Sequence, residues 1–178
     1  MSTMKIINSV VLFSLIIAVT ACKQAAKPVQ NAETKTDSGK ATVARVVDTA
    51  NTADVFNTYI GLKNQFLKSN VTGIKSTAAL LENKLAGIKG CTETATLAHQ
   101  ITTSNDIDAQ RSTFLILSKD IIGLVKGAKF KAATIYVDYC PMADSGKGGY
   151  WLSVNKAIEN PYFPEHMKEC GQVKEQIN

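Results

Sequence analysis

Four stretches of apolar residues that recur at three- and four-residue spacing fill the middle of this 178-residue chain. Such spacing places the apolar side chains on one face of an α-helix, and that face has to be buried against another element. Short polar connections separate the stretches, so consecutive helices are expected to pack antiparallel. The sequence therefore predicts helices over residues 52–68, 71–88, 92–103 and 107–127, arranged as an up-down bundle.

The last quarter of the chain has a different pattern. Residues 132–139 are β-branched and aromatic with partial alternation, and residues 150–153 form a second such stretch after a glycine-rich turn. Two such stretches can form a short β-hairpin. Residues 165–173 are expected to form a final short helix, since Pro164 is tolerated in a first helical turn. The expected fold is mainly α, an antiparallel up-down helical bundle with an irregular C-terminal tail that can contain a short β-hairpin.

The beginning of the chain carries signals of export. Lys5 precedes an apolar run over residues 6–19, which is too short to span a bilayer comfortably and is typical of a secretory signal. The run ends in Val-Thr-Ala-Cys at residues 19–22, which resembles a bacterial lipobox. This resemblance implies cleavage before Cys22 and lipidation of its sulfur. Lys23 follows, where an inner-membrane signal would often place aspartate, so the outer membrane facing the periplasm is the expected location.

Composition divides the chain into three parts. Residues 22–48 hold no aromatic residue and few large aliphatic ones, so they cannot bury enough surface to offset the entropy of ordering. We expect a signal peptide at residues 1–21, a flexible tether at 22–48 and a single domain at 49–178. The net charge of +5 is scattered, and no basic block interleaves with aromatic residues, so no nucleic-acid partner is expected.

Soft metal ligands gather near the C-terminus. Cys140 and Met142 lie in one short segment, and His166, Met167 and Cys170 lie in another. Thiolate and thioether sulfur together select soft ions, above all Cu(I). An extended first segment and a helical second one would each present their ligands on one side of the backbone. These five residues are therefore candidate ligands for copper(I), with His166 in an auxiliary role.

Cys140 and Cys170 can instead form a disulfide. An exported domain folds in an oxidising compartment, where cysteines pair. The bridge would close a loop of about 30 residues and stabilise the fold by roughly 3–4 kcal/mol. Met142 and Met167 would then be apolar filler of the core. The sequence alone does not distinguish the metal site from the disulfide. Both can also occur in turn, because the two thiols could bind a metal ion when reduced and form the disulfide when oxidised.

Other polar residues have ordinary explanations. His99 is expected at a helix edge, and Arg111 is expected to pair with a carboxylate such as Asp138 or Asp144. The chain has no nucleophile elbow, phosphate-binding loop or metalloprotease helix motif, and it has only two histidines. We therefore expect no enzyme.

Four short motifs carry a resemblance to a known family. They are Arg-Ser-Thr-Phe-Leu-Ile-Leu-Ser at residues 111–118, Tyr-Cys-Pro-Met-Ala at 139–143, Gly-Tyr-Trp-Leu-Ser at 149–153 and Ile-Glu-Asn-Pro-Tyr-Phe at 158–163. Together they resemble an uncharacterised bacterial domain-of-unknown-function family, found in exported lipoproteins and at the C-terminus of heavy-metal efflux adaptors. Short heavy-metal-binding modules of efflux systems are also similar, but Ala143 stands where they carry histidine.

The resemblance implies a role in handling copper or other heavy metals in the cell envelope. The expected function is a lipid-anchored periplasmic protein that binds copper or a similar soft heavy metal as an accessory to metal efflux or homeostasis. Its expected partners are the membrane, through the lipid on Cys22, and a heavy-metal efflux adaptor. The alternative is a disulfide-stabilised interaction domain that docks on an envelope protein and binds no metal.

Overall fold

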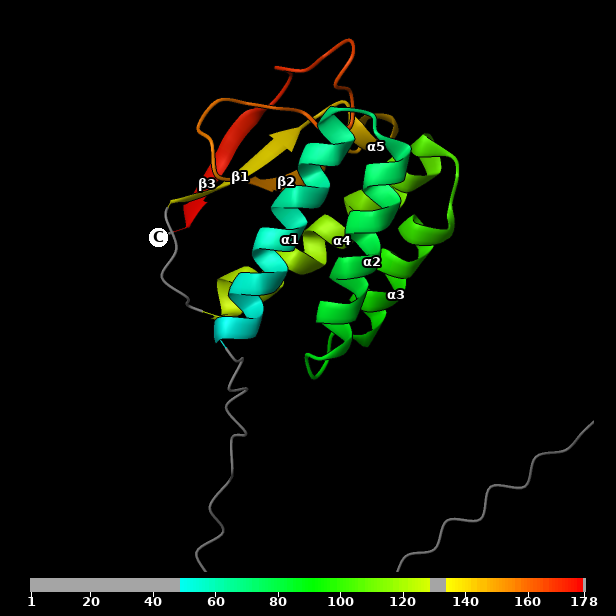
Figure 1. Cartoon of the computed structure of the whole chain (residues 1–178). Helices are drawn as coiled ribbons and strands as arrows, with labels where there is room; N and C mark the ends of the chain where they lie inside the picture. Colours follow the sequence, from blue (N-terminus) through cyan, green and yellow to red (C-terminus); the bar gives the residue numbers. More distant parts are fainter. Residues whose placement is uncertain (1–48, 129–133, 178) are drawn as a thin grey trace, which may run out of the picture. The chain divides into compact units, whose positions relative to one another are not determined.

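The computed structural model describes residues 49–128 and 134–177 (Figure 1). The elements in these ranges are helices α1 (Thr49–Leu67), α2 (Val71–Ala86), α3 (Thr92–Thr103) and α4 (Ile107–Ala128), strand β1 (Ile135–Cys140), the short helix α5 (Ala143–Gly146), and strands β2 (Gly149–Ser153) and β3 (Gln172–Ile177). The predicted signal peptide, tether and lipidation at Cys22 lie outside the described residues. Among the helices described here, none is long and apolar enough to cross a membrane.

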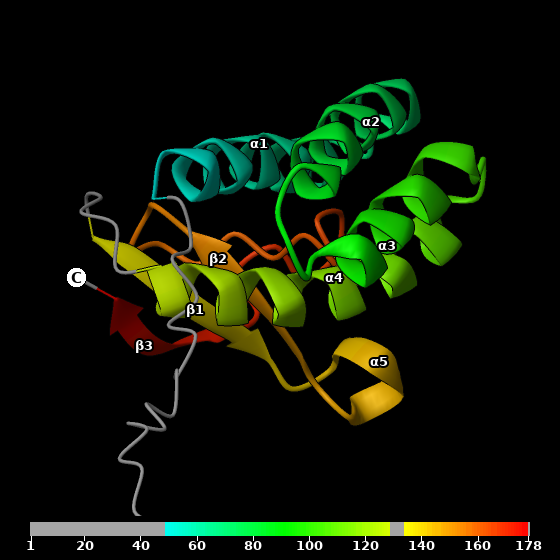
Figure 2. The same cartoon turned by 90° about the horizontal axis from the view of Figure 1, so that it is seen from below.

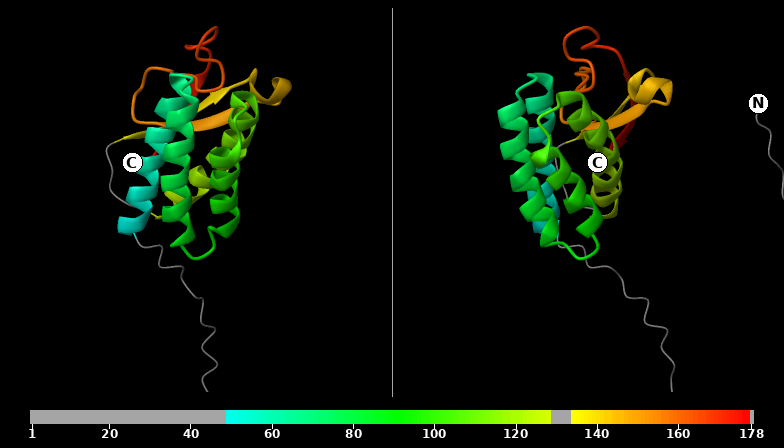
Figure 3. Two further views of the ribbon diagram at one scale, coloured as in Figure 1. Left: turned by 45° about the vertical axis from the view of Figure 1, so that its right-hand side comes forward. Right: turned by 90° about the vertical axis from the view of Figure 1, so that its right-hand side faces the viewer.

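The four predicted helices form the predicted bundle. Consecutive helices pack against each other, and α4 also contacts α1. Figure 1 shows α4 passing behind α1 and α2 and ending beside the start of α1. The sheet and the tail lie against the upper part of these helices in both views of Figure 3. The mainly helical fold with a small sheet near the C-terminus is therefore confirmed.

Aromatic side chains join the bundle to the C-terminal part. The ring centroid of Phe114 in α4 lies 4.6 Å from that of Phe66, 5.3 Å from that of Tyr59 and 6.1 Å from that of Tyr162. All four rings are buried. The hydroxyl of Tyr59 accepts a hydrogen bond of 3.2 Å from the backbone N–H of Leu152 in β2. Burial raises the pKa of Tyr59, so this contact is made by a neutral hydroxyl.

The sheet has the order β2-β1-β3, and both pairings are antiparallel. The hairpin predicted from the sequence is confirmed as β1 and β2, in which Asp138 lies opposite Trp151. The helix predicted over residues 165–173 is wrong, because residues 161–170 form turns and bends and the chain is already in β3 at Gln172. A helix there would leave one edge of β1 without partners for its backbone groups, and β3 supplies them.

Helix α2 begins with a side-chain cap at Asn70. Its Oδ1 accepts a hydrogen bond of 3.0 Å from the backbone N–H of Gly73. Replacing Asn70 with alanine is expected to lower the free energy of unfolding by about 1 kcal/mol, because that N–H loses its partner. Urea denaturation measures the loss. The matched control is Asn105→Ala, which removes an exposed amide bonded only to the side chain of Lys75. Equal losses for the two variants would contradict the capping role.

Candidate functional site

Two cysteines that are 30 residues apart in the sequence meet at the junction of the sheet and the tail. The Sγ atoms of Cys140, at the end of β1, and Cys170, just before β3, lie 3.9 Å apart. Both side chains are thiols. Cys140 is completely buried, whereas Cys170 is partly exposed. One sulfur therefore belongs to the core, and the other is open to solvent.

A buried asparagine fixes the backbone that carries Cys170. The Nδ2 of Asn160 donates a hydrogen bond of 2.8 Å to the carbonyl oxygen of Cys170. The backbone N–H of Asn160 donates to the carbonyl of Lys168 at 2.7 Å. Asn160 is itself fully buried, so its bonds are shielded from competing water. The position of Cys170 is thus set by bonds across the tail and not by a helix.

The glycine after Cys170 allows the chain to approach β1 closely. Gly171 has φ 153°, and a Cβ placed there would lie 2.9 Å from the carbonyl oxygen of Tyr139 and 3.0 Å from Cη2 of Trp151. Only glycine avoids these contacts in that conformation. The close approach brings Cys170 beside Cys140, which follows Tyr139 in β1.

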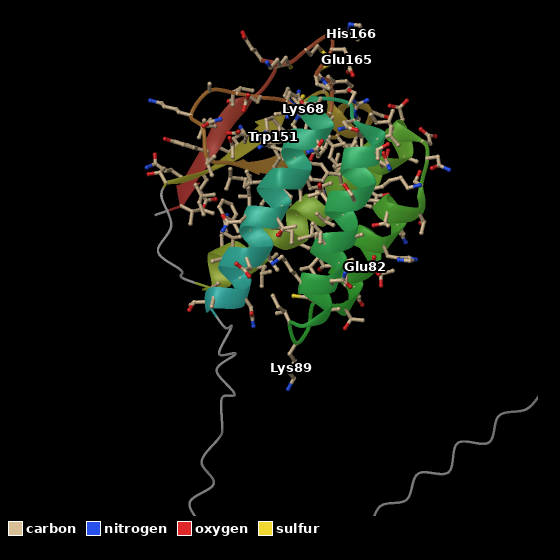
Figure 4. All side chains as sticks on the ribbon, in the orientation of Figure 1. Lys68, Glu82, Lys89, Trp151, Glu165 and His166 are labelled. Atoms are coloured by element: carbon tan, nitrogen blue, oxygen red, sulfur yellow. The ribbon has the colours of Figure 1, made fainter. Side chains whose placement is uncertain are left out.

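The other three candidate ligands lie in different settings. The condition that residues 139–142 are extended is not met, since β1 ends at Cys140, and Met142, in the turn before α5, has φ −85° and is 53% exposed. His166 is exposed, and Figure 4 shows it at the outer edge of the tail, away from Trp151. Met167 is half-buried, and although no helix forms over residues 165–173, its carbonyl oxygen accepts a hydrogen bond of 3.0 Å from the backbone N–H of Cys170, which keeps the two residues close in a turn.

Metal ligands other than the two thiols are scarce. Within residues 49–128 and 134–177, no three side chains of the types His, Cys, Asp and Glu gather closely enough to hold a metal ion. Of the five predicted ligands, Cys140 and Cys170 are the pair whose sulfur atoms the structure brings together. A structural zinc site, which takes four protein ligands, does not fit a pair.

The separation of the two sulfurs suits a shared metal ion. With metal–sulfur bonds of about 2.3 Å, two thiolates on one ion lie roughly 3.8 Å apart at a tetrahedral angle and roughly 4.6 Å apart in a linear arrangement. The observed 3.9 Å lies near the lower end of this interval, so a linear arrangement on one ion requires the two sulfurs to separate by roughly 0.7 Å. A disulfide needs the sulfurs at about 2.05 Å, so its formation requires them to move together. Partial burial and the neighbouring Cys140 raise the pKa of Cys170, so binding an ion releases protons.

A set of buried charged groups lies beside Cys140. Asp138 points to the same face of β1 and is completely buried, as is Trp151 opposite it. Among the described residues, neither carboxylate oxygen of Asp138 nor the indole N–H of Trp151 makes a hydrogen bond of normal geometry. Burial raises the pKa of Asp138 to about 7, and the positive charge of Lys63 opposes that rise. The indole N–H nevertheless lies near enough to the carboxylate to lower its pKa as well.

Lys63 of α1 is only 1% exposed, and its Nζ lies 3.4 Å from Oε2 of Glu159 in the tail. Burial would raise the pKa of Glu159, but the amide of Asn155 and the charge of Lys63 lower it overall. Sequence reasoning missed this lysine. Its spacing in the sequence could have indicated that it is buried. Lys63 follows Tyr59 by four residues and precedes Phe66 by three, which puts it on the buried face of α1.

Arg111 anchors the tail at a second point. Its Nη2 donates hydrogen bonds to Oγ of Ser69 at 2.9 Å and to Oε1 of Glu165 at 3.4 Å, and the hydroxyl of Ser69 also donates to Glu165. The hydrogen bond from the hydroxyl of Ser69 is the largest cause that lowers the pKa of Glu165, and its own backbone N–H and the charge of Arg111 also lower it. Arg111 thus pairs with carboxylates, as expected, but its partners are Glu165 and Asp108. The suggested partners Asp138 and Asp144 are wrong, and Asp138 is buried in the core.

The remaining sequence candidate is peripheral to this site. His99 is exposed on α3, and its Nδ1 lies 3.1 Å from Oε1 of Glu82 on α2. This is the helix-edge position expected from the sequence. The pair is separate from the two thiols, so it contributes no ligand to them.

Comparison with known proteins identifies the helical part only. A family model described as "Protein of unknown function (DUF3347)" matches residues 55–132. The match runs from Val55 in α1 through α4 and stops before β1, so Cys140 and Cys170 lie outside it. An uncharacterised domain of unknown function is thus confirmed for the bundle, whereas three of the four motifs that suggested a family lie beyond the matched segment. No curated protein and no solved structure matches the chain.

Proposed function

We propose that this chain is a lipid-anchored protein of the bacterial cell envelope that holds one Cu(I) ion between Cys140 and Cys170. The Sγ–Sγ separation of 3.9 Å carries the proposal. Thiolate pairs select soft ions, and a site of two sulfurs excludes the four-coordinate arrangement that structural zinc takes. Cu(I) is the soft ion that this pair suits best.

The unequal burial of the two sulfurs supports a role in holding and passing on the ion. Cys140 is enclosed by the core, while Cys170 is partly exposed and offers a route for exchange with a partner. The motif resemblance supports a heavy-metal efflux adaptor as that partner. The lipobox at residues 19–22 supports an anchor on Cys22, in the outer membrane facing the periplasm. The proposed role is an accessory to metal efflux or homeostasis, without catalysis.

A second candidate function rests on the same separation of the sulfurs. Rotation of the two side chains could bring Cys140 and Cys170 into a disulfide, which would fix the tail on the sheet. The domain would then serve as an interaction module that docks on an envelope protein without metal.

Titration of the purified, reduced full chain with Cu(I) distinguishes the two functions. We expect one Cu(I) per chain in competition with a chelating dye, and two sulfur ligands in the X-ray absorption spectrum. Mass spectrometry of a non-reducing digest reports the disulfide in a parallel oxidised sample, which is expected to bind no Cu(I). If the reduced chain also fails to bind Cu(I), the metal proposal is wrong and the interaction module is favoured.

A further inference from the structure

A groove runs between the second half of α4 and the sheet, with a volume of about 480 Å³. Three lysines, one glutamate and three apolar or aromatic residues line it: Lys119, Lys126, Lys174, Glu175, Ile122, Val137 and Tyr150. We call it the lysine groove. Its lining combines an apolar floor with cationic side chains, a combination that suits an anion attached to an apolar body.

The lysine groove has an excess of positive charge. Lys119 and Lys126 are two helical turns apart on one face of α4, and Lys174 reaches the groove from β3. Lys126 forms an ion pair with Glu175. Among the described residues, Lys119 and Lys174 have no carboxylate partner, and the Nζ of Lys174 lies 5.2 Å from the ring centroid of Tyr139. Two of the three charges therefore remain available to a ligand.

The lysine groove extends toward the end of the domain where the anchored segment enters. Figure 2 shows that α4 ends, β1 begins and β3 ends at the same end of the domain at which α1 begins. The tether predicted for residues 22–48 would have a root-mean-square end-to-end distance of about 30 Å as a flexible coil. A membrane that holds the lipid on Cys22 would therefore lie within reach of the groove.

We infer that the lysine groove binds phosphate headgroups of anionic phospholipids in the membrane to which the chain is anchored. Lysine binds phosphate as a point charge, and the aliphatic side chains of Ile122 and Val137 in the lining can contact the first methylene groups of the acyl chains. Each lysine near an anionic surface strengthens binding by about fivefold. This inference rests on the lipid anchor of the proposed function and is independent of the two thiols.

Amine labelling of the lipidated full chain tests the inference. The chain is reconstituted in vesicles of phosphatidylcholine, with and without phosphatidylglycerol, and mass spectrometry follows acetylation of each lysine. Phosphatidylglycerol is expected to slow labelling of Lys119, Lys126 and Lys174 about fivefold. Lys68, exposed at the opposite end of α1, is the internal reference and should be unaffected (Figure 4). High salt should remove the difference.

Matched variants and a phosphate control sharpen the test. Lys119→Gln with Lys174→Gln should abolish the protection of Lys126, whereas Lys68→Gln with Lys75→Gln, which changes the net charge equally at the opposite end of α1 and the start of α2, should retain it. Equal slowing at Lys68, or no slowing in the groove, would overturn the inference. Equal protection by free inorganic phosphate over neutral vesicles would overturn the lipid assignment. A chain that fails to float with neutral vesicles would overturn the anchor and this inference together, and leave Cu(I) binding as a separate result.

Discussion

Cu(I) binding is expected to disappear when Cys140 and Cys170 are both replaced by serine. Each serine removes a thiolate, and the described residues offer no cluster of three His, Cys, Asp or Glu side chains to take over. Loss of a residue that only supports a metal ligand costs about 10- to 100-fold in affinity, so loss of a direct ligand should exceed 100-fold. Competition titration of the reduced variants against a Cu(I)-selective dye measures the change.

The other candidate ligands provide the matched controls. Met142→Leu and His166→Gln alter side chains that are exposed to solvent and do not face the buried sulfur of Cys140 from within the core, so Cu(I) affinity should change little. Met167→Leu retains the apolar volume and should also bind. If any of these variants loses as much affinity as Cys170→Ser, the ion is held by the larger set expected from the sequence, and the two-thiol site is wrong.

The free energy of unfolding is expected to fall as the pH rises from about 4 to about 7, because of Asp138. Burial raises the pKa of its carboxyl group from 3.8 to about 7 in the folded chain. Below pH 4 the group is protonated in both states, and its contribution to stability is fully present. As the pH rises, the unfolded chain loses this proton first, and the folded chain becomes relatively less stable until the folded pKa is passed. The shift of about three pKa units corresponds to a loss of about 4 kcal/mol.

Replacing Asp138 with asparagine should remove most of this pH dependence. The amide has nearly the same shape and does not ionise, so the variant should be less pH-dependent and more stable than the native chain at pH 8. Denaturant titrations of the reduced, metal-free protein at pH 4, 6 and 8 measure both effects. The control is Asp144→Asn, at a carboxylate 44% exposed in the pair with Lys147. An unchanged slope in the Asp138 variant would show that another group causes the dependence.

Local pattern was enough to predict the helices but not the third strand. The apolar residues of α1, α2 and α4 repeat at helical spacing, and this signal is contained within each segment. The strand β3 carries no comparable signal, since five of its six residues are exposed. Its conformation comes from pairing with β1, more than thirty residues earlier, which a local reading of residues 165–177 does not include.

The candidate site was predictable in its chemistry but only partly in its geometry. Soft ligands drew attention to Cys140 and Cys170, and the structure brings these two together. The spacing rules for Met142 and His166 failed, because each rule assumed a regular element that ends earlier or does not form. The burial of Lys63 and Asp138 depends on which faces of α1 and β1 the fold encloses. The pattern of apolar residues does not predict that a charged residue will be buried on such a face.

The two attachments of the tail limit how far Cys170 can travel. Glu165 is held by Arg111 and Ser69, and Gly171 is pressed against β1. The segment between Glu165 and Gly171 is short and is fixed at both ends. Cys170 can therefore move out of contact with Cys140 only if the backbone of this segment changes conformation. Entry and exit of an ion then require a local displacement while the bundle and the sheet stay in place. Exchange of the ion with a partner would then take place at the partly exposed sulfur of Cys170.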